Sequence, residues 1–172
     1  MCWLRPVEDY VSSVCCLVAA AGALAHLQHT ARCAHVHVAF PYVDASAVVM
    51  ACDDAVIALL NKDFRGKPQP TNVLSWPSAD LASDVAGQVP NFALNPELGD
   101  IALSFETCTG EAEAAGLAIS DHVSHLLIHA TLHLLGYDHI EDTDAELMEQ
   151  IEIDVLAKLG IFNPYDINDE TQ

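Results

Sequence analysis

Positively charged residues are rare in this 172-residue chain. Six Lys and Arg residues stand against 25 Asp and Glu, so the formal net charge is −19. Such a surface repels polyanions, which at face value argues against nucleic-acid binding. The few cations are unevenly distributed, however: Lys62, Arg65 and Lys67 form one cluster, and none lies between Pro68 and Ala157. A single basic spot on an acidic body can still hold one phosphate group locally.

Paired cysteines and long apolar runs are also missing. The six cysteines form no C-x-x-C pair, and most lie in apolar surroundings, where a free thiol packs as a small hydrophobe. This pattern favours a reducing cytosol over a disulfide framework and predicts a cytoplasmic protein. The apolar run 14–25 resembles the core of a signal peptide, but acidic residues precede it and it is too short to span a bilayer. We interpret it as part of a buried amphipathic helix and expect no membrane partner.

The length corresponds to about one domain, and 52% apolar against 18% charged residues indicates a folded chain. We expect strands at 33–40, 73–76 and 99–105, and an ordered loop over 65–72. Helices are predicted over 6–27, from Asp44 or Ser46 to about 61, and over 107–116. Ser120 should cap a fourth helix, and a capping box of Thr143 and Glu146 should open a fifth that Gly160 ends. Residues 1–172 are therefore predicted to form a single α+β domain, with a small mixed sheet packed against helices.

The most informative pattern is H-A-T-L-H-L-L-G-Y-D-H, which places imidazoles at His129, His133 and His139. Residues four apart lie on one helix face, so the first two can hold one ion together. Gly136 can adopt the left-handed conformation that ends a helix, and the turn would bring His139 round as a third ligand. Three neutral imidazoles describe a catalytic zinc site with an open position, and we expect one Zn²⁺ ion.

One glutamate is conspicuously absent from this pattern. In metallopeptidases of the H-E-x-x-H-x-x-G-x-x-H type, a Glu after the first histidine is the general base. Here that position is Ala130. The metal-binding part of the motif is present without the base that peptide hydrolysis needs, so a peptidase is a poor first interpretation.

Two further polar residues are candidates for supporting roles. His125 precedes His129 by one helical turn and is either a catalytic or substrate-facing residue or a histidine of the core. Asp138 precedes the third histidine and can accept an N–H from a liganding imidazole, or simply form the turn. The residues alone leave both alternatives open.

The chain resembles the YbeY family of bacterial endoribonucleases, the rRNA maturation factors. The resemblance covers roughly residues 33 to 165. Two separated motifs carry it in the same order and spacing, the segment from Leu60 to Pro77 and the histidine motif with its run into Glu141 and Asp142. Gly99, Asp100 and the Leu159–Gly160 ending also fit. One departure is Ala130, where the family usually has Gly, and we expect a modest packing change from it.

This resemblance implies a zincin-like fold, a zinc ion on His129, His133 and His139, and a functional arginine at Arg65. It implies cleavage of single-stranded RNA during 16S rRNA 3′-end maturation and late ribosome quality control. Expected partners are rRNA and either small-subunit proteins or an assembly GTPase. The strongly acidic composition favours such a partner, because it argues against tight RNA binding by the chain alone.

The corresponding mechanistic hypothesis divides the work between the metal and the basic cluster. Arg65, with Lys67, would bind the scissile phosphate and offset charge that develops in the transition state. The general base is open between His125 and Asp138, and in a further alternative the 2′-OH of the substrate itself serves as the nucleophile. Two other functions remain possible: a metallopeptidase with a non-standard base, and a non-catalytic, zinc-stabilised ribosome-assembly factor.

Overall fold

The computed structural model describes residues 32–40, 43–90 and 97–166, and the side chains from Ala45 onward within these ranges. The helix expected over 6–27 lies outside the described residues. The described elements are, in order, β1 (Arg32–Phe40), β2 (Val43–Cys52), α2 (Asp54–Arg65), β3 (Val73–Pro77), β4 (Glu97–Ser104), α3 (Phe105–Ala115), α4 (Ile119–Leu134) and α5 (Asp142–Lys158).

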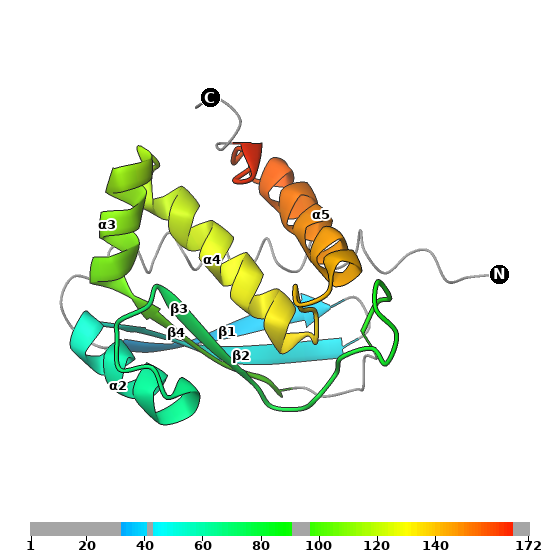
Figure 1. Cartoon of the computed structure of the whole chain (residues 1–172), viewed down its shortest axis with the longest axis horizontal. Helices are drawn as coiled ribbons and strands as arrows, with labels where there is room; N and C mark the ends of the chain where they lie inside the picture. Colours follow the sequence, from blue (N-terminus) through cyan, green and yellow to red (C-terminus); the bar gives the residue numbers. More distant parts are fainter. Residues whose placement is uncertain (1–31, 41–42, 91–96, 167–172) are drawn as a thin grey trace.

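The four described strands form one mixed sheet in the order β1-β2-β4-β3 (Figure 1). Strand β2 is antiparallel to β1 and parallel to β4, and β3 is antiparallel to β4. Strand β3 therefore lies at an edge of the sheet. This arrangement confirms the predicted α+β class with a small mixed sheet.

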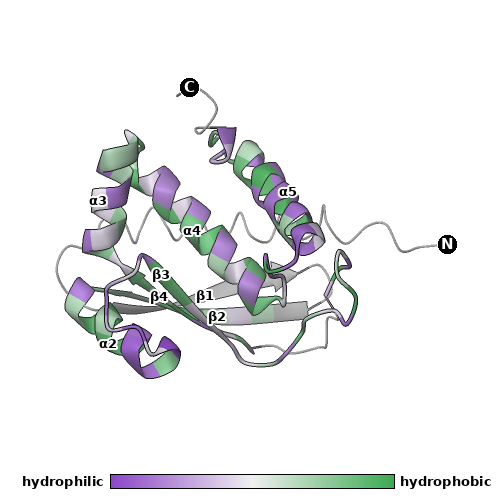
Figure 2. Ribbon diagram, viewed as in Figure 1, coloured by the Kyte–Doolittle hydropathy of each residue, from purple (hydrophilic) through white to green (hydrophobic). Residues whose placement is uncertain are grey.

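Side chains alternate between the two faces of the sheet and build two apolar clusters. On one face, Val49 of β2 and Ile101 and Leu103 of β4 pack against α4 and α5. On the other face, Leu74 and Ala102 pack with Ile57 of α2. Figure 1 shows α4 and α5 on one side of the sheet and α2 on the other, and Figure 2 shows that these helices carry both hydrophobic and hydrophilic residues.

The prediction of a helix beginning at Asp44 or Ser46 was wrong. Residues 43–52 form β2, and the helix begins only at Asp54, where Asp53 caps it by accepting the Val56 N–H at 2.8 Å. The alanines of 45–51 favour a helix locally, but hydrogen bonding to β1 on one side and β4 on the other overrides that preference. The end of α2 at Arg65 follows from Gly66, which has a φ of 69°.

The two predicted helix caps were also wrong, although their helices exist. Helix α4 begins after Ala118, so Ser120 lies inside its first turn, and no side chain caps it. Helix α5 begins after Glu141, which places Thr143 inside the helix, again without a side-chain cap. In the part of the chain that the structure describes, no helix combines the length and the hydropathy needed to cross a membrane.

Candidate metal centre and cleft

Helix α4 presents His129 and His133 from one side while its other side is buried. Leu127, Ile128 and Ala130 are at most 1% exposed and belong to the main core, so the orientation of the helix is fixed by packing. The two imidazoles lie one turn apart with ring centroids 4.6 Å from each other. Their Nε2 atoms are separated by 3.1 Å.

Gly136 ends this helix and turns the chain so that His139 returns to the same place. Its φ is 90°, and a Cβ atom there would come within 2.6 Å of the Leu81 carbonyl carbon, so both conformation and space require glycine. The ring of His139 lies 5.3 Å from that of His129 and 5.1 Å from that of His133, centroid to centroid. One nitrogen from each of the three histidines lies within 4.8 Å of the others. The structure thus brings together the three residues predicted as ligands.

The hydrogen bonds of the Nδ1 atoms of His129 and His133 determine which ring nitrogens face the centre of this three-histidine site. His129 Nδ1 donates to Glu152 Oε1 at 2.8 Å, and His133 Nδ1 donates to the Tyr137 carbonyl oxygen at 3.0 Å. Neutral imidazoles with the proton on Nδ1 carry lone pairs on Nε2. Two lone pairs facing each other at 3.1 Å repel unless a cation lies between them. The donor set therefore fits a metal ion.

The protonation state of His133 suits a ligand as well. Burial lowers the pKa of this imidazole, and the nearby His129 lowers it further, while the hydrogen bond to Tyr137 opposes the shift. At neutral pH the ring is thus held uncharged. Metal ions bind neutral imidazole, so no proton has to be removed from His133 first.

Glu152 on α5 anchors the site, and it was not among the residues expected from the sequence. Its side chain is fully buried, and its carboxylate accepts from His125 Nε2 at 3.0 Å, from His129 Nδ1 and from the Tyr165 hydroxyl. Burial alone would raise its pKa, but these hydrogen bonds outweigh burial and lower the pKa to about 2. The signal was present: Glu152 occupies a position on the apolar face of α5, between Met148 and Val155.

The two supporting candidates lie in different surroundings. The His125 ring points to Glu152 and stacks edge-on against Tyr165, with centroids 6.1 Å apart. Asp138 accepts the backbone N–H of His139 at 2.7 Å. The imidazole N–H groups of His129 and His133 go instead to Glu152 and Tyr137.

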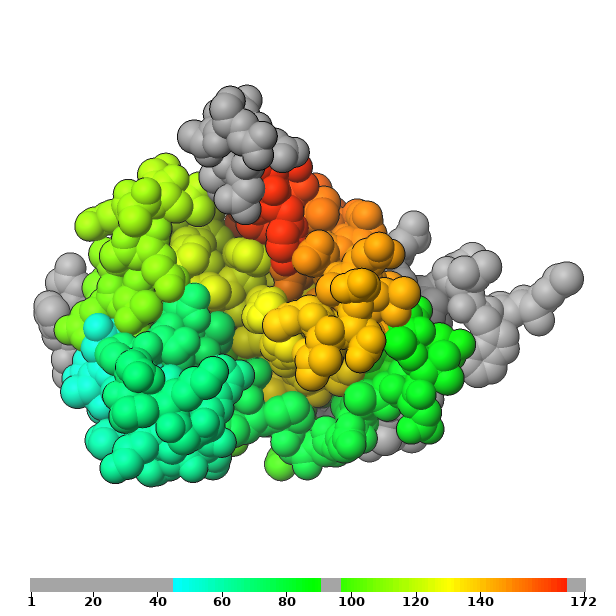
Figure 3. All heavy atoms as spheres, in the orientation of Figure 1, coloured from blue at the N-terminus to red at the C-terminus, as the bar shows by residue number. Residues whose placement is uncertain are grey.

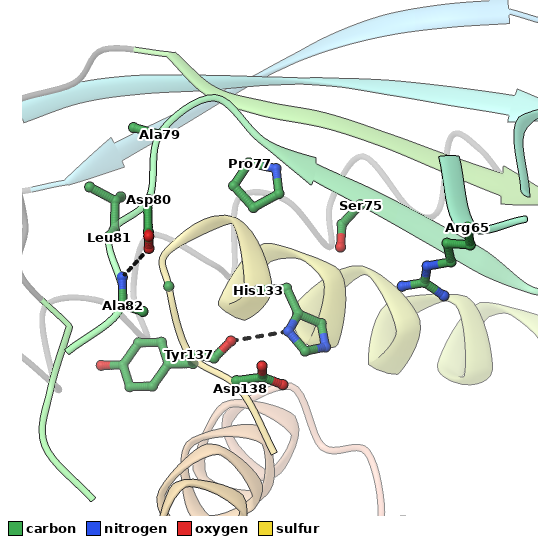
Figure 4. A pocket seen from close by; sticks show the side chains of 11 residues that line it. Arg65, Ser75, Pro77, Ala79, Asp80, Leu81, Ala82, His133, Tyr137 and Asp138 are labelled. Atoms are coloured by element: carbon green, nitrogen blue, oxygen red, sulfur yellow. Dashed lines mark hydrogen bonds between the residues drawn. The ribbon is translucent and has the colours of Figure 1, made fainter. Parts of the chain in front are cut away.

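A cavity of about 470 Å³ opens beside the site, with polar groups at both ends. Arg65 lines one end and Asp80 the other, and His133 lies between them (Figure 4). Asp138 also lines this cavity, whereas Lys67 is exposed outside its lining. Figure 3 shows the corresponding hollow between the region of α2 and β3 and the start of α5. The structure thus places Arg65, predicted from a separate motif, in one cleft with a histidine of the site.

Fold and site together define an α+β protein with a three-histidine group that can hold a metal ion beside an arginine-lined cleft. Comparison with known proteins identifies the family to which the protein belongs. The sequence model of the family described as Endoribonuclease YbeY matches residues 23–160. The chain belongs to this family.

Two relatives named endoribonuclease YbeY agree with the family match. An endoribonuclease YbeY of Jannaschia sp. (strain CCS1) is 54% identical over 123 residues, which cover 71% of this chain and 77% of that protein. One from Paracoccus denitrificans (strain Pd 1222) is 58% identical over 118 residues, covering 69% of this chain and 68% of the relative. The solution structure of TM1509 from Thermotoga maritima matches with 24% identity and a TM-score of 0.42, over 72% of this chain and 76% of that one.

Proposed function

We propose that this protein is a zinc-dependent endoribonuclease, specific for single-stranded RNA, that acts in 16S rRNA 3′-end processing and late ribosome quality control in the cytoplasm. Family membership supports the general activity: the chain is a hydrolase that cuts RNA. The observation that carries the metal dependence is the pair of facing Nε2 atoms of His129 and His133.

Zinc is the metal that best suits this donor set. We propose that one ion is held by His129, His133 and His139, because three imidazoles are a ligand set typical of catalytic zinc. When bound, the ion would supply Lewis acidity to a phosphoryl oxygen of the substrate. Glu152 and the Tyr137 carbonyl would hold the first two rings in the tautomer that ligation needs.

Arg65 is the residue that we propose binds the scissile phosphate. Its side chain lines the cavity together with His133, and among the described residues it forms no ion pair. A guanidinium group can donate two parallel hydrogen bonds to a phosphate and stabilise added negative charge on it. Lys67 is exposed and follows Gly66, the C-cap residue of α2. It would contribute only long-range attraction for the phosphate.

For proton transfer, the geometry favours Asp138 over His125. Asp138 lines the cavity that Arg65 and His133 share, whereas the Nε2 atom of His125 is bonded to the buried Glu152. We therefore propose that His125 contributes to the reaction by helping to hold Glu152, and that Asp138 takes the proton from the attacking nucleophile, which is either a water molecule or the 2′-OH of the RNA.

The acidic composition bears on how the enzyme reaches its substrate. With a net charge of −19, long-range electrostatics oppose the approach of free RNA. We propose that a partner, either a small-subunit protein or an assembly GTPase, brings the RNA to the cleft. Peptide hydrolysis is less well supported, because Ala130 is 1% exposed in the core and offers no carboxylate beside the metal ligands.

A comparison of three substrates tests this proposal. The zinc-loaded protein is incubated with a single-stranded RNA, with the same RNA annealed to its complement, and with an unstructured protein. We expect cleavage of the single strand alone, and removal of the 3′ extension when immature small subunits are the substrate. Cleavage of the unstructured protein without cleavage of RNA would instead indicate a peptidase, and ribosome binding without any cleavage would indicate an assembly factor.

A further inference from the structure

Two aromatic side chains lie next to the cleft without taking part in the chemistry described above. Phe64 lies in the last turn of α2, next to Arg65, and its ring centroid lies 4.9 Å from that of Trp76 on β3, with the ring planes tilted by 57°. Phe64 is 62% exposed. Trp76 is partly buried because it packs against the apolar cluster around Leu74. The pair thus combines an anchored ring with an exposed one.

The backbone connects this pair directly to the cleft. Residues Ser75 and Pro77, on either side of Trp76, line the cavity, as does Arg65 next to Phe64. Because side chains alternate along a strand, Trp76 lies on the face of β3 opposite to its two neighbours. Because β3 is an edge strand of the described sheet, the cavity and the aromatic pair lie on the two faces of one edge, and a strand that passes round this edge at Arg65 meets both.

Charge identifies the kind of ligand that fits here. Lys62, Arg65 and Lys67 lie within three residues of Phe64, and all three are exposed on a chain of net charge −19. Aromatic rings among cations are the chemistry that binds single-stranded nucleic acid, because bases stack on the rings while phosphates meet the charges. A base pair within a duplex has its faces covered by its neighbours, so only an unpaired base can stack in this way.

We propose that Phe64 and Trp76 form a stacking site for an unpaired nucleobase of the RNA strand whose phosphate contacts Arg65. This inference rests on the proposed function and deepens it, because it supplies a physical reason for single-strand preference. The site acts in binding, and it lies outside the group of residues that contact the reacting phosphate.

Tryptophan fluorescence can test this site, since the chain has two tryptophans and Trp3→Phe leaves Trp76 as the only one. The zinc-loaded Trp3→Phe protein is titrated with a 2′-O-methyl RNA of about ten nucleotides, a length within the usual site size for single strands. An abasic backbone of the same length is the comparison ligand. We expect the base-bearing strand to quench Trp76 and bind more tightly, and the abasic strand to leave the fluorescence unchanged.

Two variants separate stacking from general surface effects. Phe64→Ala should weaken binding of the base-bearing strand about 10-fold, the size expected for one stacked base, and leave binding of the abasic strand unchanged. Phe64→Tyr should restore the affinity. Leu59→Ala is the matched control, because Leu59 lies on the same helix and is 61% exposed, and it should change neither affinity.

Equal affinity for the two strands, or an unchanged affinity in Phe64→Ala, would overturn the stacking site. A change in the mass of the free protein on Phe64→Ala, measured by sedimentation, would also overturn it, because the patch would then contact a second copy. RNA cleavage by the unaltered protein is measured alongside. If cleavage persists while stacking fails, the proposed function stands without this site, and if cleavage is absent, the proposed function itself has failed.

Discussion

Glu152 and His129 form the contact that orders the three-histidine site: the buried carboxylate Oε1 lies 2.8 Å from the imidazole Nδ1. The same carboxylate also accepts from His125 and from Tyr165, which follows the end of α5. A negative charge with three donors is stable inside the protein, although burial alone would disfavour it. One residue of α5 therefore fixes the orientation of an imidazole on α4.

Replacing this carboxylate should weaken metal binding. Glu152→Gln keeps the shape but removes the charge and presents an N–H₂ group to donors that need an acceptor. We expect zinc affinity, measured by competition with a chelator, to fall about 10- to 100-fold, as for other residues that orient metal ligands. Glu146→Gln, on an exposed position of the same helix, is the control and should bind zinc normally. Unchanged affinity in a folded Glu152→Gln protein would contradict the role given to this contact.

The turn at Gly136 provides a second test, with a control inside the chain. Gly136→Ala puts an alanine at a φ of 90° and a Cβ atom 2.6 Å from the Leu81 carbonyl carbon. Gly116 has a φ of 68°, and a Cβ atom added there would have no heavy atom within 4 Å, so Gly116→Ala carries the conformational cost alone. That cost is about 1–2 kcal/mol. We expect chemical denaturation to show a larger loss of unfolding free energy for Gly136→Ala, and zinc affinity to fall in that variant only. Equal losses in the two variants would show that the close approach to Leu81 is unimportant.

Away from the site, Asp54 should make stability depend on pH. It accepts hydrogen bonds from Ser104 at 2.5 Å and Thr107 at 2.6 Å, and these lower the pKa of its carboxyl group below 3.8. A carboxyl group whose pKa is lower in the folded state stabilises the protein above its ordinary pKa, and this stabilisation is lost as the pH falls below it.

The measurement compares the unfolding free energy of the unaltered protein with that of Asp54→Asn from about pH 6 down to about pH 3. We expect the unaltered protein to be more stable at the upper end and the difference to shrink at the lower end. Leu59→Ala, at an exposed position on the same helix and without a titratable group, should show no such convergence. A difference that stays constant across this range would contradict the effect of the two hydrogen bonds.

Much of this site could be predicted because it is encoded locally. The spacing of His129, His133 and His139 around Gly136 follows from helix periodicity and one left-handed turn, both of which depend on nearby residues. The presence of Arg65 in the same cavity as His133 could not be predicted that way. It depends on how α2 packs against β3 at the edge of the sheet, and only the resemblance to a family indicated it.

The errors have a common physical cause, which is that long-range contacts override local preference. The alanines of β2 favour a helix until strands pair on both sides of them. Glu152 was missed for a related reason. The role of a single acidic residue on an apolar helix face depends on its hydrogen-bond donors. For Glu152 these are His125, His129 and Tyr165, which lie 27, 23 and 13 residues away in the chain.

The central claim is that a three-histidine zinc site and Arg65 act on one RNA phosphate, and combined metal analysis and RNA cleavage tests it most directly. Arg65→Ala should retain one zinc ion per chain and lose cleavage by about 100-fold or more, the size typical for removing one group that stabilises transition-state charge. His133→Ala should lose both zinc and cleavage, while Leu59→Ala should keep both. Full cleavage by zinc-free His133→Ala, or by Arg65→Ala, would contradict the account.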